Sequence, residues 1–170
     1  MMKLLRNLAT GALAGVVGTA AMDLLLYERY RRNGGKEGLW RWEFAGDVMS
    51  WQDASAPGKL GQRALRAAIG REPPDEWART TTNIVHWATG VGWGIQYGVV
   101  ANVTSRHPWA RALALGPVAW LSGYVALPLA KVYKPIWKYD AKTLADDLST
   151  HLVYGSATSA AFATIASRRP

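Results

Sequence analysis

The segment TNIVHWATGVGWGIQYGVVANV, residues 82–103, contains no aspartate, glutamate, lysine or arginine. It is about as long as the roughly 20 residues that a helix needs to cross a bilayer. Gly90, Gly94 and Gly98 stand four residues apart, so they form one smooth stripe on a helix. In lipid such a stripe lets a neighbouring helix approach closely, whereas in a water-soluble helix each glycine costs about 1 kcal/mol relative to alanine. The segment therefore predicts a transmembrane helix that packs through its glycines.

Three other apolar runs between charged flanks extend this prediction to a bundle. The fold class that we expect is all-α, a four-helix transmembrane bundle forming a single integral membrane domain over residues 1–170. Glycines in the first run resemble a small-residue packing face of the Gly-x-x-x-Gly type. A cleaved signal peptide is the alternative for this run, but a charged flank like a membrane exit follows it. The four expected spans are residues 8–27, 84–103, 111–131 and 145–166.

A long polar connection, residues 28–81, separates the first two spans. Residues 40–51 place large apolar side chains on one helical face, and residues 59–70 do the same with basic residues interspersed. Both patterns predict short amphipathic helices that lie on a bilayer surface or cap the bundle. Packing on each other as a small water-soluble cap is the alternative.

The amino-acid composition limits which partners the protein can bind and which chemistry it can perform. The chain has a net charge of +8, nine tryptophans, two phenylalanines and no cysteine. A basic chain favours anionic partners, and tryptophan favours membrane interfaces. The basic residues flank apolar runs instead of covering one folded face, which argues against nucleic acid. We therefore expect the lipid bilayer as the main partner, with another membrane protein or a second copy of the chain as further candidates.

Two histidines occupy matching positions in the predicted bundle. His86 and His151 each begin the pattern His-x-x-x-Gly-x-x-x-small, near the start of the second and fourth spans. Asp23 lies about one turn from the end of the first span, and Asp147 lies one turn before His151. In an up-down bundle all four residues would lie at similar depth near one surface. The sequence thus predicts a polar layer, in which the two imidazoles face each other or share a neighbour.

Three roles for this layer stay open. Its members could join helices by hydrogen bonds, or they could form a proton-responsive or ion-conducting site, since ionisable residues inside a membrane are costly and histidine titrates near neutral pH. Alternatively, His86 and His151 could bind metal or haem, with the aspartates completing a zinc site. No phosphate loop, catalytic zinc helix or nucleophile elbow is present, so no catalytic residue and no cofactor is assigned.

The carboxy-terminal half resembles the YagU-like family of small bacterial inner-membrane proteins. The similar features are a histidine opening one span, a proline (Pro128) closing the next, and the pattern Asp147-x-x-x-His151-Leu-Val. This resemblance implies a multi-pass protein of the bacterial inner membrane, but no particular biochemical role. Asp23 and the long polar connection lie outside it.

These observations lead to one expected function and one alternative. We expect a non-enzymatic inner-membrane protein that acts in proton or small-solute handling, or as an accessory membrane subunit. The alternative is a membrane-embedded metal- or haem-binding protein or enzyme that uses His86 and His151.

Overall fold

The computed structural model describes residues 2–103 and 108–167. Within these residues the chain is helical and contains no strand, which confirms the predicted all-α class. The elements are α1 (Met2–Arg32), α2 (Leu39–Glu43), α3 (Ala56–Ile69), η1 (Asp75–Trp77), α4 (Ala78–Val103), α5 (Pro108–Leu129), η2 (Ile136–Lys138) and α6 (Ala141–Ser167).

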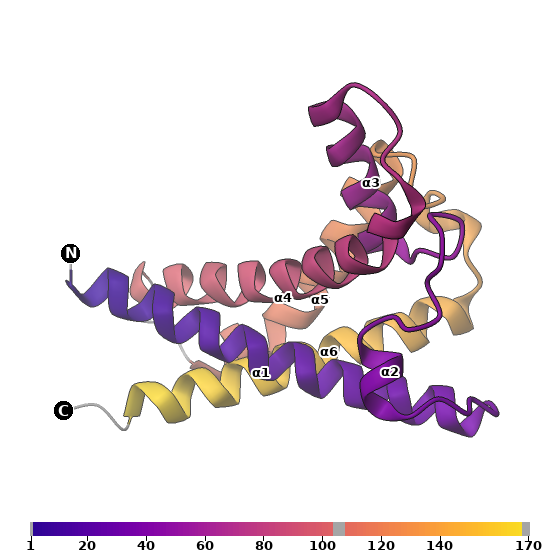
Figure 1. Cartoon of the computed structure of the whole chain (residues 1–170). Coiled ribbons are helices and arrows are strands. Elements are labelled where there is room, and N and C mark those ends of the chain that lie inside the picture. The colour runs from indigo at the N-terminus through magenta and orange to yellow at the C-terminus, as the bar shows by residue number, and fades with distance from the viewer. Residues whose placement is uncertain (1, 104–107, 168–170) are drawn as a thin grey trace.

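The four long helices α1, α4, α5 and α6 form the body of the molecule. Figure 1 shows α1 running against both α4 and α6, which start at the same end of the bundle and are parallel to each other. Helix α1 makes the most extensive contacts, with α4 on one side and α6 on the other, and α5 packs mainly on α6. The described ends of the chain lie at one end of the bundle, whereas α2 and α3 lie toward the other.

Glycines bring α1 and α4 into backbone contact. A Cβ atom added at Gly94 would collide with the carbonyl oxygen of Gly11 and approach the backbone of Gly15, and one added at Gly98 would collide with the carbonyl oxygen of Asn7. The stripe of residues 82–103 therefore packs on the glycine face of the first helix, as its spacing predicted. The other helix pairs use the same device, since Gly18 of α1 faces Thr158 of α6 and Gly155 of α6 faces Gly116 of α5.

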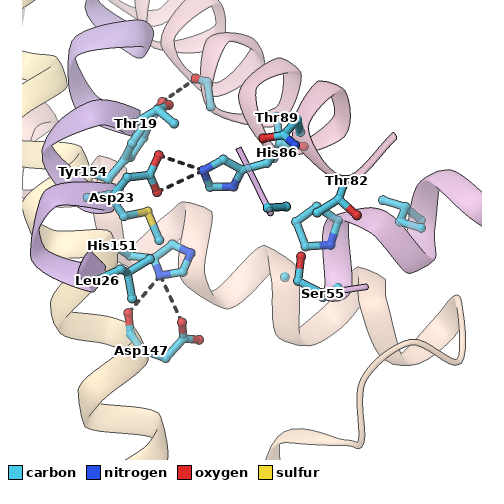
Figure 2. A pocket seen from close by; sticks show the side chains of 18 of the residues that line it. Thr19, Asp23, Leu26, Ser55, Thr82, His86, Thr89, Asp147, His151 and Tyr154 are labelled. Carbon is cyan, nitrogen blue, oxygen red and sulfur yellow. Dashed lines mark hydrogen bonds and ion pairs between the residues drawn. The ribbon is translucent and has the colours of Figure 1, made fainter. Parts of the chain in front are cut away.

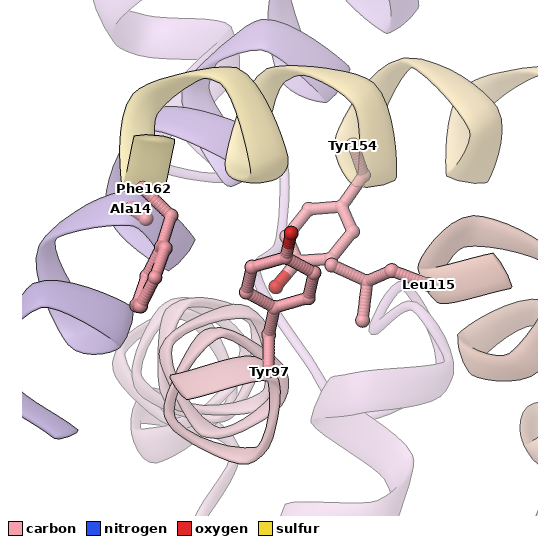
Figure 3. Packing of buried hydrophobic residues seen from close by; sticks show 5 residues of the cluster. All are labelled: Ala14, Tyr97, Leu115, Tyr154 and Phe162. Atoms are coloured by element: carbon pink, nitrogen blue, oxygen red, sulfur yellow. The ribbon is translucent and has the colours of Figure 1, made fainter. Parts of the chain in front are cut away.

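The interior is built from small and hydroxyl-bearing side chains. The largest fully buried side chains are all threonines, namely Thr10, Thr19, Thr150 and Thr158. Two of these hydroxyls donate to backbone carbonyls of their own helix, Thr19 Oγ1 to Gly15 O at 2.9 Å and Thr150 Oγ1 to Asp147 O at 2.7 Å. The apolar core is correspondingly small, and Figure 3 shows its cluster of Ala14, Tyr97, Leu115, Tyr154 and Phe162.

Large aliphatic side chains lie on the outside of the same helices. Val17 and Leu24 on α1, Val100 on α4 and Leu121 and Val125 on α5 are all exposed. This distribution is the reverse of that in a water-soluble core, where Leu, Ile and Val are among the most buried residues. Among the described helices, α1 is the one that is both long and apolar enough to cross a membrane, and residues Leu113–Leu129 form a shorter apolar helix.

The predicted helix over residues 40–51 is wrong beyond its first turn. Helix α2 ends at Glu43, because Ala45 adopts a left-handed conformation with φ of 48° and the Gly46 N–H returns to the Arg41 carbonyl oxygen at 2.7 Å. The expected apolar face is consequently divided. Its first members, Trp40 and Phe44, are exposed, and its last members, Val48 and Trp51, enter a separate core.

The second amphipathic helix is confirmed, with its start at Ala56 instead of residue 59. Helix α3 packs on the first turns of α4, where Gly58 admits the Thr82 side chain and Gly61 admits Thr81 and Val85. Together with Val48, Trp51, Ala54 and Ala78 it forms a small cap over that end of the bundle. The Trp51 indole donates its N–H to Pro73 O at 2.8 Å, which ties this cap to the chain entering α4.

The third long helix ends two residues before the predicted boundary at residue 131. Lys131 is left-handed, with φ of 52°, and the Val132 N–H donates to the Leu127 carbonyl oxygen at 2.9 Å. This arrangement closes the helix in the manner of a Schellman motif. It also turns the following residues, including Tyr133, back toward the start of α6.

Candidate functional site

A cavity of about 720 Å³ lies where α1, α2, α3, α4, α5 and α6 approach one another at the capped end of the bundle. All four residues of the predicted polar layer line it, namely Asp23, His86, Asp147 and His151. Figure 2 shows the two imidazoles facing the same space from different helices. The four predicted residues are therefore brought to one cavity, and their function as a layer stays a prediction.

The central contact of the site joins α1 to α4. His86 Nε2 lies 3.0 Å from both carboxylate oxygens of Asp23, so one N–H is shared between two acceptors. Asp23 is 4% exposed. A buried carboxylate without a partner would be strongly destabilising, and the imidazole of His86 supplies this partner. The sequence placed both residues in one layer, but it did not indicate which acid would pair with which histidine.

The second histidine interacts mainly within its own helix. His151 Nδ1 donates to the backbone carbonyl oxygen of Asp147 at 2.9 Å, and the Asp147 carboxylate is 3.6 Å from the same nitrogen. The acid of this longer pair is also more exposed, since the Asp147 side chain is 29% exposed and the Asp23 side chain 6%. Each imidazole therefore has its own acid, and the two pairs face one cavity from different helices.

Glu43 is a member of the site that the sequence analysis missed. Three aromatic rings dock α2 onto α1, because Trp42 lies 5.4 Å from Tyr27 and 6.0 Å from Tyr30 between ring centroids. This docking carries the next residue, Glu43, to the cavity wall beside Asp23 and His86. Burial, and then the negative charge of Asp23, raise the pKa of the Glu43 carboxyl above its ordinary value.

A tyrosine that follows α5 lies near the second pair. Tyr133 lines the cavity and packs 5.6 Å from Tyr124 and 6.1 Å from Tyr139 between ring centroids. Burial, with a smaller contribution from the negative charge of Asp147, raises the pKa of the Tyr133 phenol. Neither Glu43 nor Tyr133 has a sequence pattern that marks it, since both reach the site through turns whose geometry depends on tertiary contacts.

The floor of the cavity is a direct link between α4 and α6. Tyr154 donates its hydroxyl proton to the Gly90 carbonyl oxygen at 2.6 Å. The Gly90 carbonyl is available because the glycine lacks a side chain that would cover it, and Thr19 of α1 closes over the same glycine. Both Tyr154 and Gly90 line the cavity. Below this point the helices meet through their glycines, so the cavity ends where the tight packing begins.

The predicted metal alternative gains no support from the geometry. Among the described residues, no group of three or more histidine, cysteine, aspartate or glutamate side chains is arranged to hold a metal ion. In addition, one ring nitrogen of each histidine already contacts an acceptor, Nε2 in His86 and Nδ1 in His151. Haem binding by the two histidines stays an untested prediction.

The fold and this site define a helical-bundle protein with a cavity at one end whose wall carries carboxylates and histidines. No protein-family model, curated protein or solved structure matches the chain. The resemblance to the YagU-like family therefore stays a prediction that rests on the sequence motifs alone.

Proposed function

We propose that this chain is a multi-span membrane protein that binds a small solute in the capped cavity and responds there to protons. The observation that carries the proposal is the buried Asp23–His86 pair, which lies in the cavity wall with Glu43 beside it. Histidine is the side chain whose ordinary titration falls nearest to neutral pH. A proton gained or lost here would change the charge that a bound solute meets.

The distribution of side chains supports a membrane setting. Threonine, glycine and alanine fill the contacts between helices, whereas exposed valine or leucine side chains occur on each of the four long helices. Close packing through small residues is the usual way in which helices associate in lipid, because burying apolar surface gains little there. Lipid would cover the exposed aliphatic residues that water would leave unfavourably solvated. An inner-membrane location follows from this reasoning together with the sequence resemblance.

Cysteine labelling tests the membrane setting directly, since the chain has no native cysteine. Val125 of α5 is 60% exposed and Met49 of the cap region is 77% exposed. In permeabilised membranes we expect a charged maleimide to label Met49→Cys at least about ten times faster than Val125→Cys, because thiolates form poorly in hydrocarbon. Comparable labelling of both variants would show that water reaches α5 and would overturn the membrane proposal.

The proton response is tested by NMR titration of ¹⁵N-labelled histidine in lipid nanodiscs. We expect the titration midpoint of His86 to move by about one pH unit or more in Asp23→Asn, the effect of removing an adjacent charge. The matched variant Asp147→Asn should leave His86 nearly unchanged and alter His151 instead. If His86 does not titrate between pH 4 and 9, or titrates identically in the wild type and Asp23→Asn, the site is structural and the proposal fails.

A further inference from the structure

The cavity that holds the Asp23–His86 pair is acidic, although the protein as a whole is basic. The chain carries a net charge of +8. Among the described residues that line the cavity, none is lysine or arginine. Its carboxylates come from α1, α2, the loop before α3 and α6, and they are Asp23, Glu43, Asp47, Asp53 and Asp147. A pocket that concentrates one sign of charge between apolar walls raises the local concentration of ions of the opposite sign.

The rest of the wall is apolar and aromatic. Trp42 and Trp93 line the cavity together with aliphatic side chains such as Leu26, Val48 and Leu127. Aromatic faces attract organic cations, especially where water is displaced. A volume of about 720 Å³ lies in the range of sites that hold a small organic molecule. It is far larger than a bare metal ion requires, and the described residues form no metal-binding cluster.

One buried hydroxyl in this wall lacks a partner. Thr82 is 6% exposed and lines the cavity, and its Oγ1 atom has no hydrogen-bond partner among the described residues. An unpartnered buried polar atom is uncommon in folded proteins and calls for an explanation such as a bound molecule or water. One oxygen of Glu43, Oε1, is likewise buried and makes no hydrogen bond of ordinary geometry with the described residues, although the carboxyl lies beside Asp23 and Trp87. Both residues line the same cavity, and Thr82 Oγ1 lies against Gly58 of α3.

From these observations we infer that the cavity binds a monovalent organic cation, an amine or quaternary ammonium with an apolar body. The cationic group would lie near Asp23 and Glu43, and the apolar body would lie against Trp42, Trp93 and the aliphatic wall. This inference rests on the proposed solute-binding function and names the chemical class of the solute. It excludes anionic solutes and inorganic cations as the preferred ligands.

Protonation of the wall should oppose this binding. The titratable groups that face the cavity are the five carboxylates, His86, His151 and the phenols of Tyr133 and Tyr154. Arg79 approaches α2 through a hydrogen bond to the Phe44 carbonyl oxygen, but it does not line the cavity. As pH falls, the carboxylates lose negative charge and the imidazoles gain positive charge. Each change weakens the attraction for a cation, so affinity should decrease steadily from pH 8 to pH 5.

The test compares two probes of similar size and opposite permanent charge. Phenyltrimethylammonium and benzenesulfonate are both water-soluble, and neither titrates in this range. With the full-length protein in lipid nanodiscs, and empty nanodiscs as the blank, calorimetry should show stoichiometric binding of phenyltrimethylammonium. Benzenesulfonate should bind at least about tenfold more weakly, given the charge of the wall. Equal affinity for both probes, or no binding of the cation, would overturn the inference.

Variants then locate the bound cation. Glu43→Gln removes one charge from a partly exposed position, and we expect it to weaken cation binding by about tenfold. Asp23→Asn should do the same, and Glu43→Gln keeps the test decisive if Asp23→Asn does not fold. Asp140→Asn is the matched control, since Asp140 caps the start of α6 outside the cavity and asparagine preserves the cap. An equal loss of affinity in Asp140→Asn would contradict a site in the cavity.

Two further outcomes separate this inference from the proposed function. Displacement of phenyltrimethylammonium by equimolar K⁺ or Mg²⁺ would show a site for inorganic ions and would overturn the assignment to organic cations. If the cation does not bind but His86 still titrates in dependence on Asp23, the proton-responsive site stands and only the class of solute is wrong. If both results are negative, the proposed function fails together with the inference.

Discussion

The two ends of the bundle are built on opposite principles. At the end that holds the described chain termini, Gly11, Gly15, Gly94 and Gly98 let the backbones of α1 and α4 touch, and no space is left between them. At the capped end the same two helices carry Asp23 and His86, and a cavity of about 720 Å³ opens beside them. A single helix pair therefore provides rigidity at one end and a binding space at the other.

The difference shows how polar groups can be placed inside a bundle without loss of structure. The close backbone contacts fix the register of α1 against α4, and the Asp23–His86 pair forms because that register brings the two side chains together. The glycine contacts join the two helices independently of the ionisable residues. Rigid packed elements of this kind are the usual support of a functional site.

The largest effect is expected from adding a side chain to the glycine-packed end, where α1 and α4 are in backbone contact. Gly94→Ala should destabilise the bundle by about 1–3 kcal/mol, because its Cβ would collide with the Gly11 carbonyl oxygen and the α1 backbone would have to move. Gly92 is the matched control, since it lies two residues away in the same helix and a Cβ added there meets nothing within 4 Å. Gly92→Ala should be neutral or stabilising by up to about 1 kcal/mol.

Thermal unfolding of the two variants in detergent measures this difference. Loss of stability in Gly94→Ala alone would support the tight packing of α1 on α4. An equal response of the two variants would contradict it, because the glycine stripe would then face lipid or a partner instead of α1.

A smaller effect on stability, and one that depends on pH, is expected at the capped end. Because the pKa of Glu43 is raised in the folded protein, its contribution to stability is fully present below the ordinary value of 4.5 and is lost as pH rises through the folded value. Glu43→Gln should therefore be more stable than the wild type at pH 7, by a few degrees in melting temperature. The advantage should disappear as pH approaches 4.

Asp53 serves as the control, because its carboxyl pKa is shifted in the opposite direction from that of Glu43. Hydrogen bonds from the Ser50 hydroxyl and from backbone N–H groups lower the pKa of the Asp53 carboxyl, so its contribution is present above 3.8 and is lost as pH falls. Asp53→Asn should accordingly be less stable than the wild type at pH 7. Melting curves between about pH 2 and pH 8 cover both transitions, and they would refute this account of the capped end if both variants followed the same pH trend.

The glycine-packed end was largely predictable from sequence, and the capped end with its cavity was predictable only in part. Apolar runs between charged flanks identified the long helices, and the spacing of Gly90, Gly94 and Gly98 identified the packing face of α4, because helical periodicity is a local property. The layer of Asp23 and His86 followed from counting residues along antiparallel helices. Its pairing did not, because the register of two helices is decided by contacts between segments far apart in the chain.

The cap region was the least predictable. The apolar spacing of residues 40–51 matches a helix, but the chain leaves the helix at Ala45 and buries Val48 and Trp51 in a different core. Tertiary packing outweighed local periodicity there. Glu43 could not be recognised for the same reason, since its place in the site depends on Trp42 docking against Tyr27 and Tyr30.

The central position of α1 has a consequence for biosynthesis. Helix α1 is made first, yet its two glycine faces contact α4 and α6, and residues 33–77 must be synthesised before α4 begins. At roughly 5–20 residues per second, the first helix waits several seconds for one neighbour and longer for the other. In the proposed membrane setting, its glycine faces and Asp23 would meet lipid, the insertion machinery or a second nascent chain during that interval. The order of translation thus leaves the first helix, with its Asp23, without its final neighbours during that interval.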